Sequence, residues 1–393
     1  IGMSQGVTEI QTTSAGTPVV FEAATTRYFS PVFDSSNNKI IISYQDGGNG
    51  EAGTSFVGTI SGTSISFGTP VVFETGAAQR ISTDFDSSNN KVVIVYEDQG
   101  NSSYATAIVG TVSGTSISFG TPVVFASTTA SYTSCKFDSY NNKIVASYQD
   151  GSNLNYGKSV VGTVSGTSIS FGSTVTFSSS STAFISTTFD SSNNKIVIAF
   201  EDLSASGHGK AIVGTVSGTS ISFGTAATFE GVQVNKVVST FDSANNKIVV
   251  AYEDADNSNH GKAVVGTVSG TSISFGTPVV FLANTVASVG ATYDINANKV
   301  VITYGDQSNS NGAMVSGTVS GTSISFDSSF VYEDSATSFD APVFDSTNNK
   351  VLVCYRDQGN SNYGTSAVIS VGFENRGQVN AGSSATVDII GSV

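Results

Sequence analysis

Residues 85–98 read FDSSNNKVVIVYED, and this stretch returns along the chain every 51 or 52 residues. Each copy opens with an aromatic residue and an aspartate, continues through a segment rich in Ser and Asn, and ends in a nearly unbroken apolar run. Asn and Asp suit tight turns, and an unbroken run of Val and Ile is typical of a strand buried on both faces. The aromatic residue of the seven copies is Phe33, Phe85, Phe137, Phe189, Phe241, Tyr293 and Phe344.

A second motif, GT(V/I)SGTSISF, which reads GTVSGTSISF at residues 110–119, occurs only six times. Together the two motifs predict four antiparallel strands per repeat. Strand one ends at the Phe-Asp pair, strand two is the apolar run, strand three ends at a Ser-Gly-Thr-Ser hairpin, and strand four follows that hairpin. Four strands in about 50 residues are typical of a β-propeller blade. Prolines fall in four of the predicted fourth strands, which suits an outer edge: Pro18, Pro70, Pro122 and Pro278.

The missing copy of the second motif predicts how the chain ends are joined. The last repeat has no fourth strand, whereas residues 16–22 have fourth-strand sequence with no repeat before them. We therefore expect an all-β fold, a closed seven-bladed β-propeller over residues 1–373, in which the N-terminal strand 16–22 completes the last blade. Residues 374–393 form a C-terminal extension, in which SATVDII at 384–390 resembles a further strand that starts a following module.

Composition excludes several classes of function. The 393 residues carry a formal net charge of −14, which disfavours nucleic acid and anionic membrane surfaces as partners. No segment is apolar for long enough to insert in a membrane. Cys135 and Cys354 lie in non-adjacent repeats, so we expect no disulfide between them. No motif for a cofactor is present, and none is expected.

The loops predict where a ligand would bind. Loops 1–2 and 3–4 hardly change between repeats, whereas loops 2–3 and 4–1 vary strongly, for example at 24–29, 76–80 and 126–130. Because a rigid scaffold often carries function on variable loops, we expect any ligand site on that face; drift of unconstrained loops remains the alternative. The candidate ligand-binding residues there are Arg27, Tyr28, Arg80, Tyr104, Tyr156, His208, His260, Arg356 and Tyr363.

Each candidate also has a structural explanation. Tyr and His side chains stack on sugars but also pack over loops, arginines grip acidic sugars but also lie solvated on a surface, and His208 with His260 suits either a metal pair or simple packing. Two rings of aspartate, represented by Asp86 and Asp98, are expected to cap backbone N–H groups at turns rather than to hold cations. The glutamates Glu22, Glu51, Glu74, Glu230 and Glu333 are interpreted as scattered over loops.

The repeats resemble those of tail-fibre and other adhesin-like structural proteins of marine bacteriophages. The resemblance lies in the FDSSNNKVVIVYED-type units, the GTVSGTSISFGTPVVF segments and the trailing SATVDIIGSV, and it covers nearly the whole chain. It implies a virion or cell-surface location and a role in host recognition or as a spacer. The implied partners are a cell-surface glycan or receptor and other virion or fibre subunits.

Three hypotheses for function follow. The first is a non-enzymatic binding or adhesion module that recognises a glycan or another surface receptor through its variable face. The second is a structural spacer without a specific ligand, and the third is a polysaccharide-degrading enzyme. Catalysis is disfavoured because only two His and two Cys are present and the acidic residues repeat with the blades. Polar residues that break the repeat and cluster near the axis of the variable face would favour ligand binding or catalysis, and a featureless axis would favour the spacer.

Overall fold

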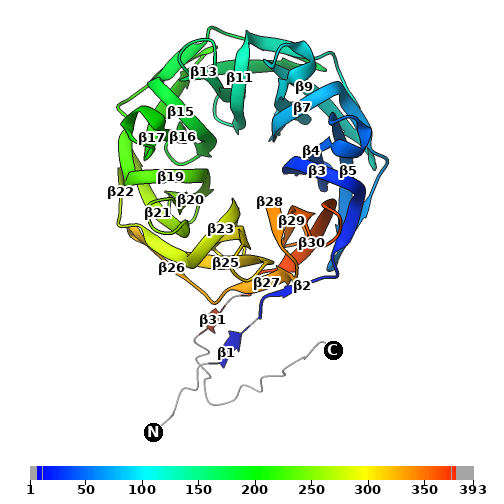
Figure 1. Ribbon diagram of the computed structural model, residues 1–393, viewed down its shortest axis with the longest axis vertical. Helices are drawn as coiled ribbons and strands as arrows, with labels where there is room; N and C mark the ends of the chain where they lie inside the picture. The colour runs from blue at the N-terminus through cyan, green and yellow to red at the C-terminus, as the bar shows by residue number, and fades with distance from the viewer. Residues whose placement is uncertain (1–6, 11, 373, 378–393) are drawn as a thin grey trace, which may run out of the picture.

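The computed structural model describes residues 7–10, 12–372 and 374–377. Antiparallel sheets stand radially around a central axis, in the arrangement of a β-propeller (Figure 1). Three short 3₁₀ helices are the helical elements of the described chain, η1 (Gly47–Asn49), η2 (Gln99–Asn101) and η3 (Leu203–Ala205). None of the described helices has the length and apolarity needed to cross a bilayer.

Strands two and three form the middle of each sheet. We number the sheets one to seven along the chain in the order of their second strands, which are β4 (Lys39–Asp46), β8 (Lys91–Asp98), β12 (Lys143–Asp150), β16 (Lys195–Asp202), β20 (Lys247–Asp254), β24 (Lys299–Asp306) and β29 (Lys350–Asp357). The third strands are β5 (Ala52–Ser61), β9 (Tyr104–Ser113), β13 (Tyr156–Ser165), β17 (His208–Ser217), β21 (His260–Ser269), β25 (Asn311–Ser320) and β30 (Tyr363–Ser370).

Long strands cross from the rim of one sheet to the axis of the next. In β7, Val71 lies opposite Ser55 of sheet one, whereas Asp86 lies opposite Lys91 of sheet two. These crossing strands are β3 (Val19–Asp34), β7 (Val71–Asp86), β11 (Val123–Asp138), β15 (Val175–Asp190), β19 (Ala227–Asp242) and β23 (Val279–Asp294); the seventh crossing is split into β27 (Phe330–Glu333) and β28 (Thr337–Asp345).

The crossing strands correct the expected 4–1 loops. Residues 24–29, 76–80 and 126–130 lie inside β3, β7 and β11, so the prediction of a loop there is wrong. The backbone can cross between the sheets because its polar groups find partners on the way. The N–H of Ala78, for example, donates to the carbonyl oxygen of Glu51 in the 2–3 loop of sheet one at 3.1 Å.

The fourth strand is completed by a short segment after the hairpin. These segments are β6 (Ser64–Phe67), β10 (Ser116–Phe119), β14 (Ser168–Phe171), β18 (Ser220–Phe223), β22 (Ser272–Phe275) and β26 (Ser323–Phe326). Each pairs with strand three, and a three-residue break such as 68–70 separates it from the crossing strand. The four prolines therefore lie in this break rather than inside a strand, where their missing N–H costs no ladder bond.

Both ends of the described chain meet at sheet seven. The short β2 (Ser14–Ala15) and the first half of β3 pair with β30, which places Val19 opposite Ser366. Outside the ring, β1 (Val7–Ile10) pairs with β31 (Glu374–Gly377). The strand expected at 384–390 lies outside the described residues.

The hydrophobic core lies between neighbouring sheets. One cluster joins Ile41 of sheet one to Val92 and Ile94 of sheet two, all with no exposed surface. Strand two of each sheet is buried along nearly its full length, which confirms the sequence prediction for that strand. Cys135 and Cys354 are buried and form no disulfide, as expected.

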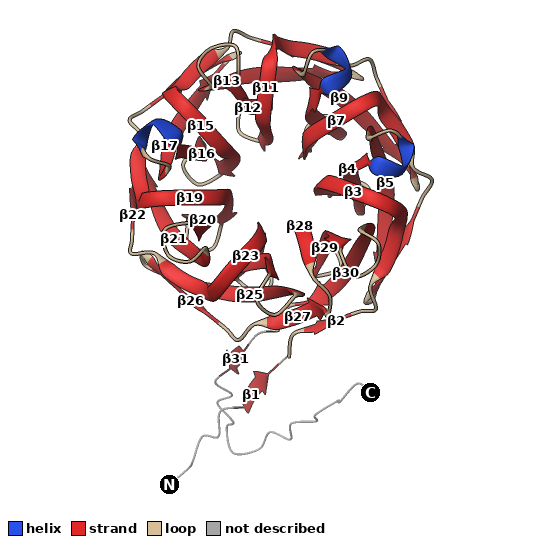
Figure 2. Ribbon diagram, viewed as in Figure 1, coloured by secondary structure: helices blue, strands red, loops and turns tan. Residues whose placement is uncertain are grey.

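The ring has two different faces. The face with the 1–2 turns and the 3–4 hairpins is here named the turn face. The opposite face carries the crossing strands and the 2–3 loops with their 3₁₀ helices, and is named the crossing face (Figure 2). The capping prediction is confirmed on both. Asp86 accepts the N–H of Ser88 and of Asn89 at 3.0 Å, and Asp98 accepts the N–H of Asn101 at 3.1 Å.

Candidate functional site

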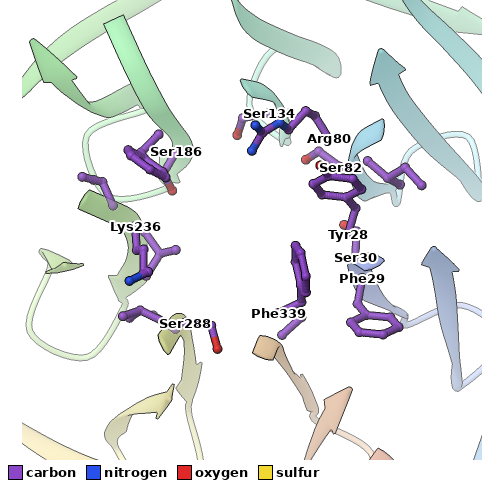
Figure 3. Close-up of a pocket in the computed structure, with 18 of the residues that line it drawn as sticks. Tyr28, Phe29, Ser30, Arg80, Ser82, Ser134, Ser186, Lys236, Ser288 and Phe339 are labelled. Carbon is purple, nitrogen blue, oxygen red and sulfur yellow. The ribbon is translucent and has the colours of Figure 1, made fainter. Parts of the chain in front are cut away.

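Each innermost strand carries a β-bulge close to the crossing face. In β3 the register shifts between Arg27 and Ser30, and the same shift recurs in all seven sheets. The bulge aims one side chain at the axis, and these seven side chains are here named the axial ring (Figure 3). Its members are Tyr28, Arg80, Tyr132, Phe184, Lys236, Ser288 and Phe339.

The backbone of the axial ring is strained. Six of its members have φ between 46° and 59°, and Ser288 is the exception. Large aromatic residues rarely adopt this left-handed conformation, which is costly and tends to occur at functional sites. The strain is therefore an independent indication of a functional site at the axis.

The ring surrounds a cavity of about 560 Å³ that opens on the crossing face. This volume lies within the range of small-molecule sites. A second cavity of about 570 Å³ lies toward the turn face, lined by the aromatic residues of the repeated Phe-Asp pairs, and the two share Lys136 in their walls. A channel of this shape leaves the axial ring accessible to a ligand from the crossing face.

Five neighbouring members of the ring form a continuous aromatic arc. The ring centroids of Phe339 and Tyr28 are 5.4 Å apart, and those of Tyr132 and Phe184 are 5.2 Å apart. The guanidinium carbon of Arg80 lies between the two pairs, 5.4 Å from the Tyr28 centroid and 4.4 Å from the Tyr132 centroid. These are cation–π distances, so Arg80 joins the two aromatic pairs.

Arg80 is the single cation of the arc. Its Nε is buried and has no hydrogen-bond partner among the described residues, and the ion pairs found there do not include it. Glu97 is the nearby acid. Burial raises the pKa of its carboxyl, against the opposing effect of hydrogen bonds and of the Arg80 charge. Because Arg80 lines the cavity, the Nη groups of its guanidinium can donate hydrogen bonds to a polar ligand group.

The remaining two members make the opposite side of the mouth polar. Lys236 Nζ donates to the carboxylate of Glu253 and to the carbonyl oxygen of Val286 at 2.8 Å. Ser288 Oγ bonds to Asp340, whose pKa is raised by burial. The cavity entrance is thus amphipathic, with aromatic rings on four sheets, the guanidinium of Arg80 between them, and the polar side chains of Lys236 and Ser288 on the other two sheets.

The predicted residues fall into two groups. Tyr28 and Arg80 are members of the axial ring. Arg356 lies beside it, with its guanidinium carbon 5.1 Å from the Phe339 centroid and its Nε donating to Ser338 Oγ at 2.9 Å. Arg27 pairs with Glu51 at 3.8 Å.

The second group lies away from the axis. Its members begin third strands, each opposite the last aspartate of strand two, in five different sheets: Tyr104, Tyr156, His208, His260 and Tyr363. They are partly buried and do not gather into one site. Among the described residues no group of three or more His, Cys, Asp or Glu side chains is arranged to hold a metal ion.

Sequence analysis missed five members of the ring, Tyr132, Phe184, Lys236, Ser288 and Phe339. The signal was present, because the position five residues before the aromatic residue of each Phe-Asp pair reads Tyr, Arg, Tyr, Phe, Lys, Ser and Phe. Variation was expected in loops, whereas this variable position lies inside a strand.

The comparisons with known proteins support the fold. No protein-family model and no curated protein matches the chain. Among solved structures, the BP39L lectin from Burkholderia pseudomallei is similar with a TM-score of 0.62 and 11% identity, over 91% of this chain and 99% of that one. A protein from Lactobacillus plantarum is similar with a TM-score of 0.54 and 11% identity, over 78% of this chain and 84% of that one. At such identities the likeness concerns the fold alone, and a tail-fibre role stays a prediction.

Proposed function

We propose that this protein is a non-enzymatic binding module that holds a glycan at the axial ring on its crossing face. The observation that carries the proposal is the ring itself. Seven equivalent positions in a nearly exact repeat hold four aromatic residues, two cations and one serine, and they meet at one cavity. The similar fold of a lectin supports a carbohydrate as the ligand.

The amphipathic mouth suits the surface of a sugar. A pyranose has an apolar C–H face that packs on aromatic rings, and a rim of hydroxyl groups that need hydrogen-bond partners. Tyr28 and Phe339 offer the rings, and the guanidinium of Arg80, which lines the same cavity, offers hydrogen-bond donors. A spacer without a ligand has no need of these strained, non-repeating side chains.

We infer further that the seven sheets form a closed propeller of seven blades. The pairing of β2 and β3 with β30 supports closure, because it joins the first and last repeats in one sheet. We also keep, as part of the proposal, display on a virion or cell surface in a host-recognition role. Its support is the resemblance of the repeats to those of phage tail-fibre and adhesin-like proteins.

The cavity favours binding over hydrolysis. Most glycosidases need two carboxyl groups that flank the scissile bond. The described lining of the axial cavity holds one, Asp340, and Tyr332 donates to it at 2.5 Å. We therefore propose no catalytic activity.

The test is a glycan array with three proteins beside the parent. Tyr28→Asn with Phe339→Asn removes two rings of the arc, and Asn tolerates the left-handed backbone. Tyr104→Ala with Tyr156→Ala removes two members of the outer group, and Tyr140→Ala removes an exposed tyrosine of the turn face as the matched control. We expect binding by the parent, its loss only in the first variant, and retention in the other two. Loss only in the Tyr104/Tyr156 variant would move the site to the 2–3 loops, and no binding by any protein would favour the spacer.

A further inference from the structure

Four junctions between sheets contain a glutamate, a tyrosine and an aspartate in the same arrangement. The glutamate lies on a crossing strand, and the other two residues lie on strand two of the following sheet. The tyrosine hydroxyl donates to Oε2 of the glutamate at 2.8–3.1 Å in every case. These sets, here named the seam pockets, are Glu22–Tyr44–Asp46, Glu74–Tyr96–Asp98, Glu230–Tyr252–Asp254 and Glu333–Tyr355–Asp357. The interpretation of these four glutamates as scattered over loops is therefore wrong.

One seam pocket contains a cation of its own. In the pocket of sheet five, Nζ of Lys262 lies 3.3 Å from Oε2 of Glu230 and 2.5 Å from Oδ2 of Asp254. The ammonium thus bridges the two carboxylates. Their side chains are only 14% and 2% exposed, so the charge of the pocket is compensated inside the protein.

The other three pockets lack this lysine. The position of Lys262 on strand three is occupied by Thr54, Thr106 and Thr365 in sheets one, two and seven. Two carboxylates therefore share each pocket without an ammonium. The effect is visible in the pKa of Glu22, which is raised by burial and by the charge of Asp46, and in the pKa of Asp98, which is raised by burial and by the charge of Glu74.

In sheets three, four and six, the positions equivalent to a seam pocket carry fewer carboxylates, and each aspartate of sheets three and four is paired with a lysine. In sheets three and four the glutamate is replaced by Ala126 or Ser178, and the single aspartate pairs with its own lysine at 2.9 and 2.7 Å. In sheet six both the glutamate and the lysine are replaced by apolar residues. Only sheets one, two and seven keep two acids without a cation.

A second observation points to a ligand in these pockets. In sheets one and seven, the hydroxyls of Thr54 and Thr365 are buried and have no hydrogen-bond partner among the described residues, although the residues are only 2% and 1% exposed. In sheet two, the hydroxyl of Thr106 donates to the carbonyl oxygen of Tyr104 at 3.4 Å, which leaves the lone pairs of its oxygen free. Thr54 lies opposite Tyr44 as Lys262 lies opposite Tyr252, so both side chains stand on the same face of their sheets. The threonine side chain therefore lies on the face of its sheet that holds the tyrosine, at the position that supplies the ammonium in sheet five.

We propose that the seam pockets of sheets one, two and seven each bind a hard divalent cation, with Ca²⁺ as the best fit. Each pocket offers only oxygen: one glutamate carboxylate, Oδ2 of one aspartate and a threonine hydroxyl, with water to complete the shell. Ca²⁺ accepts six to eight oxygens in irregular geometry, which suits ligands that come from two different sheets. The cation replaces the ammonium that Lys262 supplies in sheet five. The proposal is independent of the glycan site.

The aspartates leave the required oxygen available. In Asp46, Asp98 and Asp357 the caps of the 2–3 loops use Oδ1. Asp254 uses Oδ1 in the same way, and its Oδ2 meets Lys262. The cation would therefore bind without breaking a loop cap.

The test is a titration of the full chain with Ca²⁺ after treatment with EDTA, by isothermal calorimetry and by thermal melting. We expect three sites, and a Tm that rises with Ca²⁺ concentration because the cation binds the folded state. With two carboxylates per site, half-saturation is expected at about 10⁻⁴–10⁻³ M, as in extracellular calcium modules. A stoichiometry of zero up to 10-fold above that range, roughly 10⁻² M, overturns the proposal.

Lysine variants separate a specific site from general attraction by an acidic protein. Thr54→Lys with Thr106→Lys and Thr365→Lys copies sheet five into the three pockets, and we expect loss of all three sites and of the Tm rise. Thr63→Lys with Thr115→Lys and Thr167→Lys adds the same charge at exposed hairpin positions of the turn face, and we expect three sites to remain. Equal loss in both variants overturns the proposal. Lys262→Thr opens the pocket of sheet five and is expected to raise the number of sites to four, so the proposal stays testable even where the triple variant fails to fold.

Discussion

The turn face and the crossing face are built from the same repeats but use them differently. On the turn face, side chains of one sheet bind those of the next: Ser36 and Ser88 donate to Asn90 and Asn142, and Thr347 donates to Asn38. These asparagines hold φ of 53–54°, which their side chains tolerate. On the crossing face, the axial side chains differ in nearly every sheet and meet around a cavity. In this molecule, side chains that stay the same from sheet to sheet thus mark contacts between sheets, and side chains that vary mark the space left for a ligand.

The glycine that follows each short fourth-strand segment supports this interpretation, because it is replaced in a single sheet. A Cβ added to Gly120 would lie 1.9 Å from the carbonyl oxygen of Thr167 in the hairpin of the next sheet, and five equivalent glycines meet the same obstacle. In sheet six the equivalent residue is Asp327. Sheet seven, which follows it, is the sheet without the Ser-Gly-Thr-Ser hairpin. Glycine is therefore absent only where the neighbouring backbone is absent.

The largest expected effect comes from removing the segment that both faces share at sheet seven. Deletion of residues 1–23 removes β2 and the start of β3, including Phe21, whose ring packs against those of Phe29, Tyr44, Phe56 and Phe67. Loss of one such aromatic residue alone costs about 3–5 kcal/mol, so we expect a Tm lower by roughly 10 °C in calorimetry. Deletion of residues 1–12 keeps these strands and should melt like the parent. Equal melting of both truncated proteins would contradict closure.

Alanine at two equivalent positions tests the contact rule of the turn face. Gly120→Ala forces the hairpin of the next sheet to move and should cost about 3 kcal/mol. Asp327→Ala meets no hairpin and loses only the bonds of Asp327 to Lys299 and Ser316, which should cost about 1 kcal/mol. Urea unfolding measures both. Similar losses at the two positions would show that the glycines do not report contact between sheets.

On the crossing face, replacing one buried carboxyl by an amide is expected to stabilise the protein, whereas the same replacement on the turn face is expected to destabilise it. Glu201 is 2% exposed with an unpartnered Oε1, and burial raises the pKa of its carboxyl from 4.5 to about 7. Its protonated form is favoured by folding, so the contribution to stability is present below pH 4.5 and is lost as pH rises through about 7. Glu201→Gln, which matches Gln45 and Gln149 of other sheets, should therefore stabilise the protein at pH 8 by up to about 3 kcal/mol and by almost nothing at pH 4.

The control for this variant lies on the turn face. Asp190 accepts the N–H groups of Ser192 and Asn193 at 3.0 Å, so Asp190→Asn should destabilise the protein at pH 8. Chemical denaturation at pH 4 and pH 8 measures both variants. A stabilising Asp190→Asn, or a destabilising Glu201→Gln at pH 8, would remove this difference between the faces.

The smallest effect is expected in the belt of the turn face. Ser192 donates to Asn246 at an exposed position, and Ser192→Ala should cost about 0.5 kcal/mol in urea unfolding. The chain itself tolerates the change, because Tyr140 and Ala244 occupy the equivalent position in two other sheets. A cost above about 2 kcal/mol would show that the belt, rather than the glycine contacts, holds the turn face together.

The repeat made the strands of this fold predictable. Period, turn residues and the apolar second strand indicated four strands per unit, because each follows from local sequence. The crossing strands were mistaken for loops because residues such as Thr26 and Ala78 look polar or small out of context. Their N–H groups are satisfied by the 2–3 loops of the preceding sheet, a contact that local sequence does not reveal.

The candidate site was predictable only in part. Tyr28 and Arg80 were found because they are large residues in a variable segment. Lys236 and Phe339 were missed because the bulge that turns them toward the axis is a property of register rather than of composition. The seam pockets required the structure for the same reason, since Glu22 and Asp46 approach each other across two different sheets.

The pairing of β2 with β30 also determines how the ring would respond to mechanical load. The two strands are antiparallel, with Ser14 opposite Ser370, so both chain ends leave the ring from the same end of the ladder. A force that pulls these ends apart acts on the hydrogen bonds one after another, as in opening a zipper, rather than on all of them together. The ring would then yield first at sheet seven, while sheets one to six carry little of the tension.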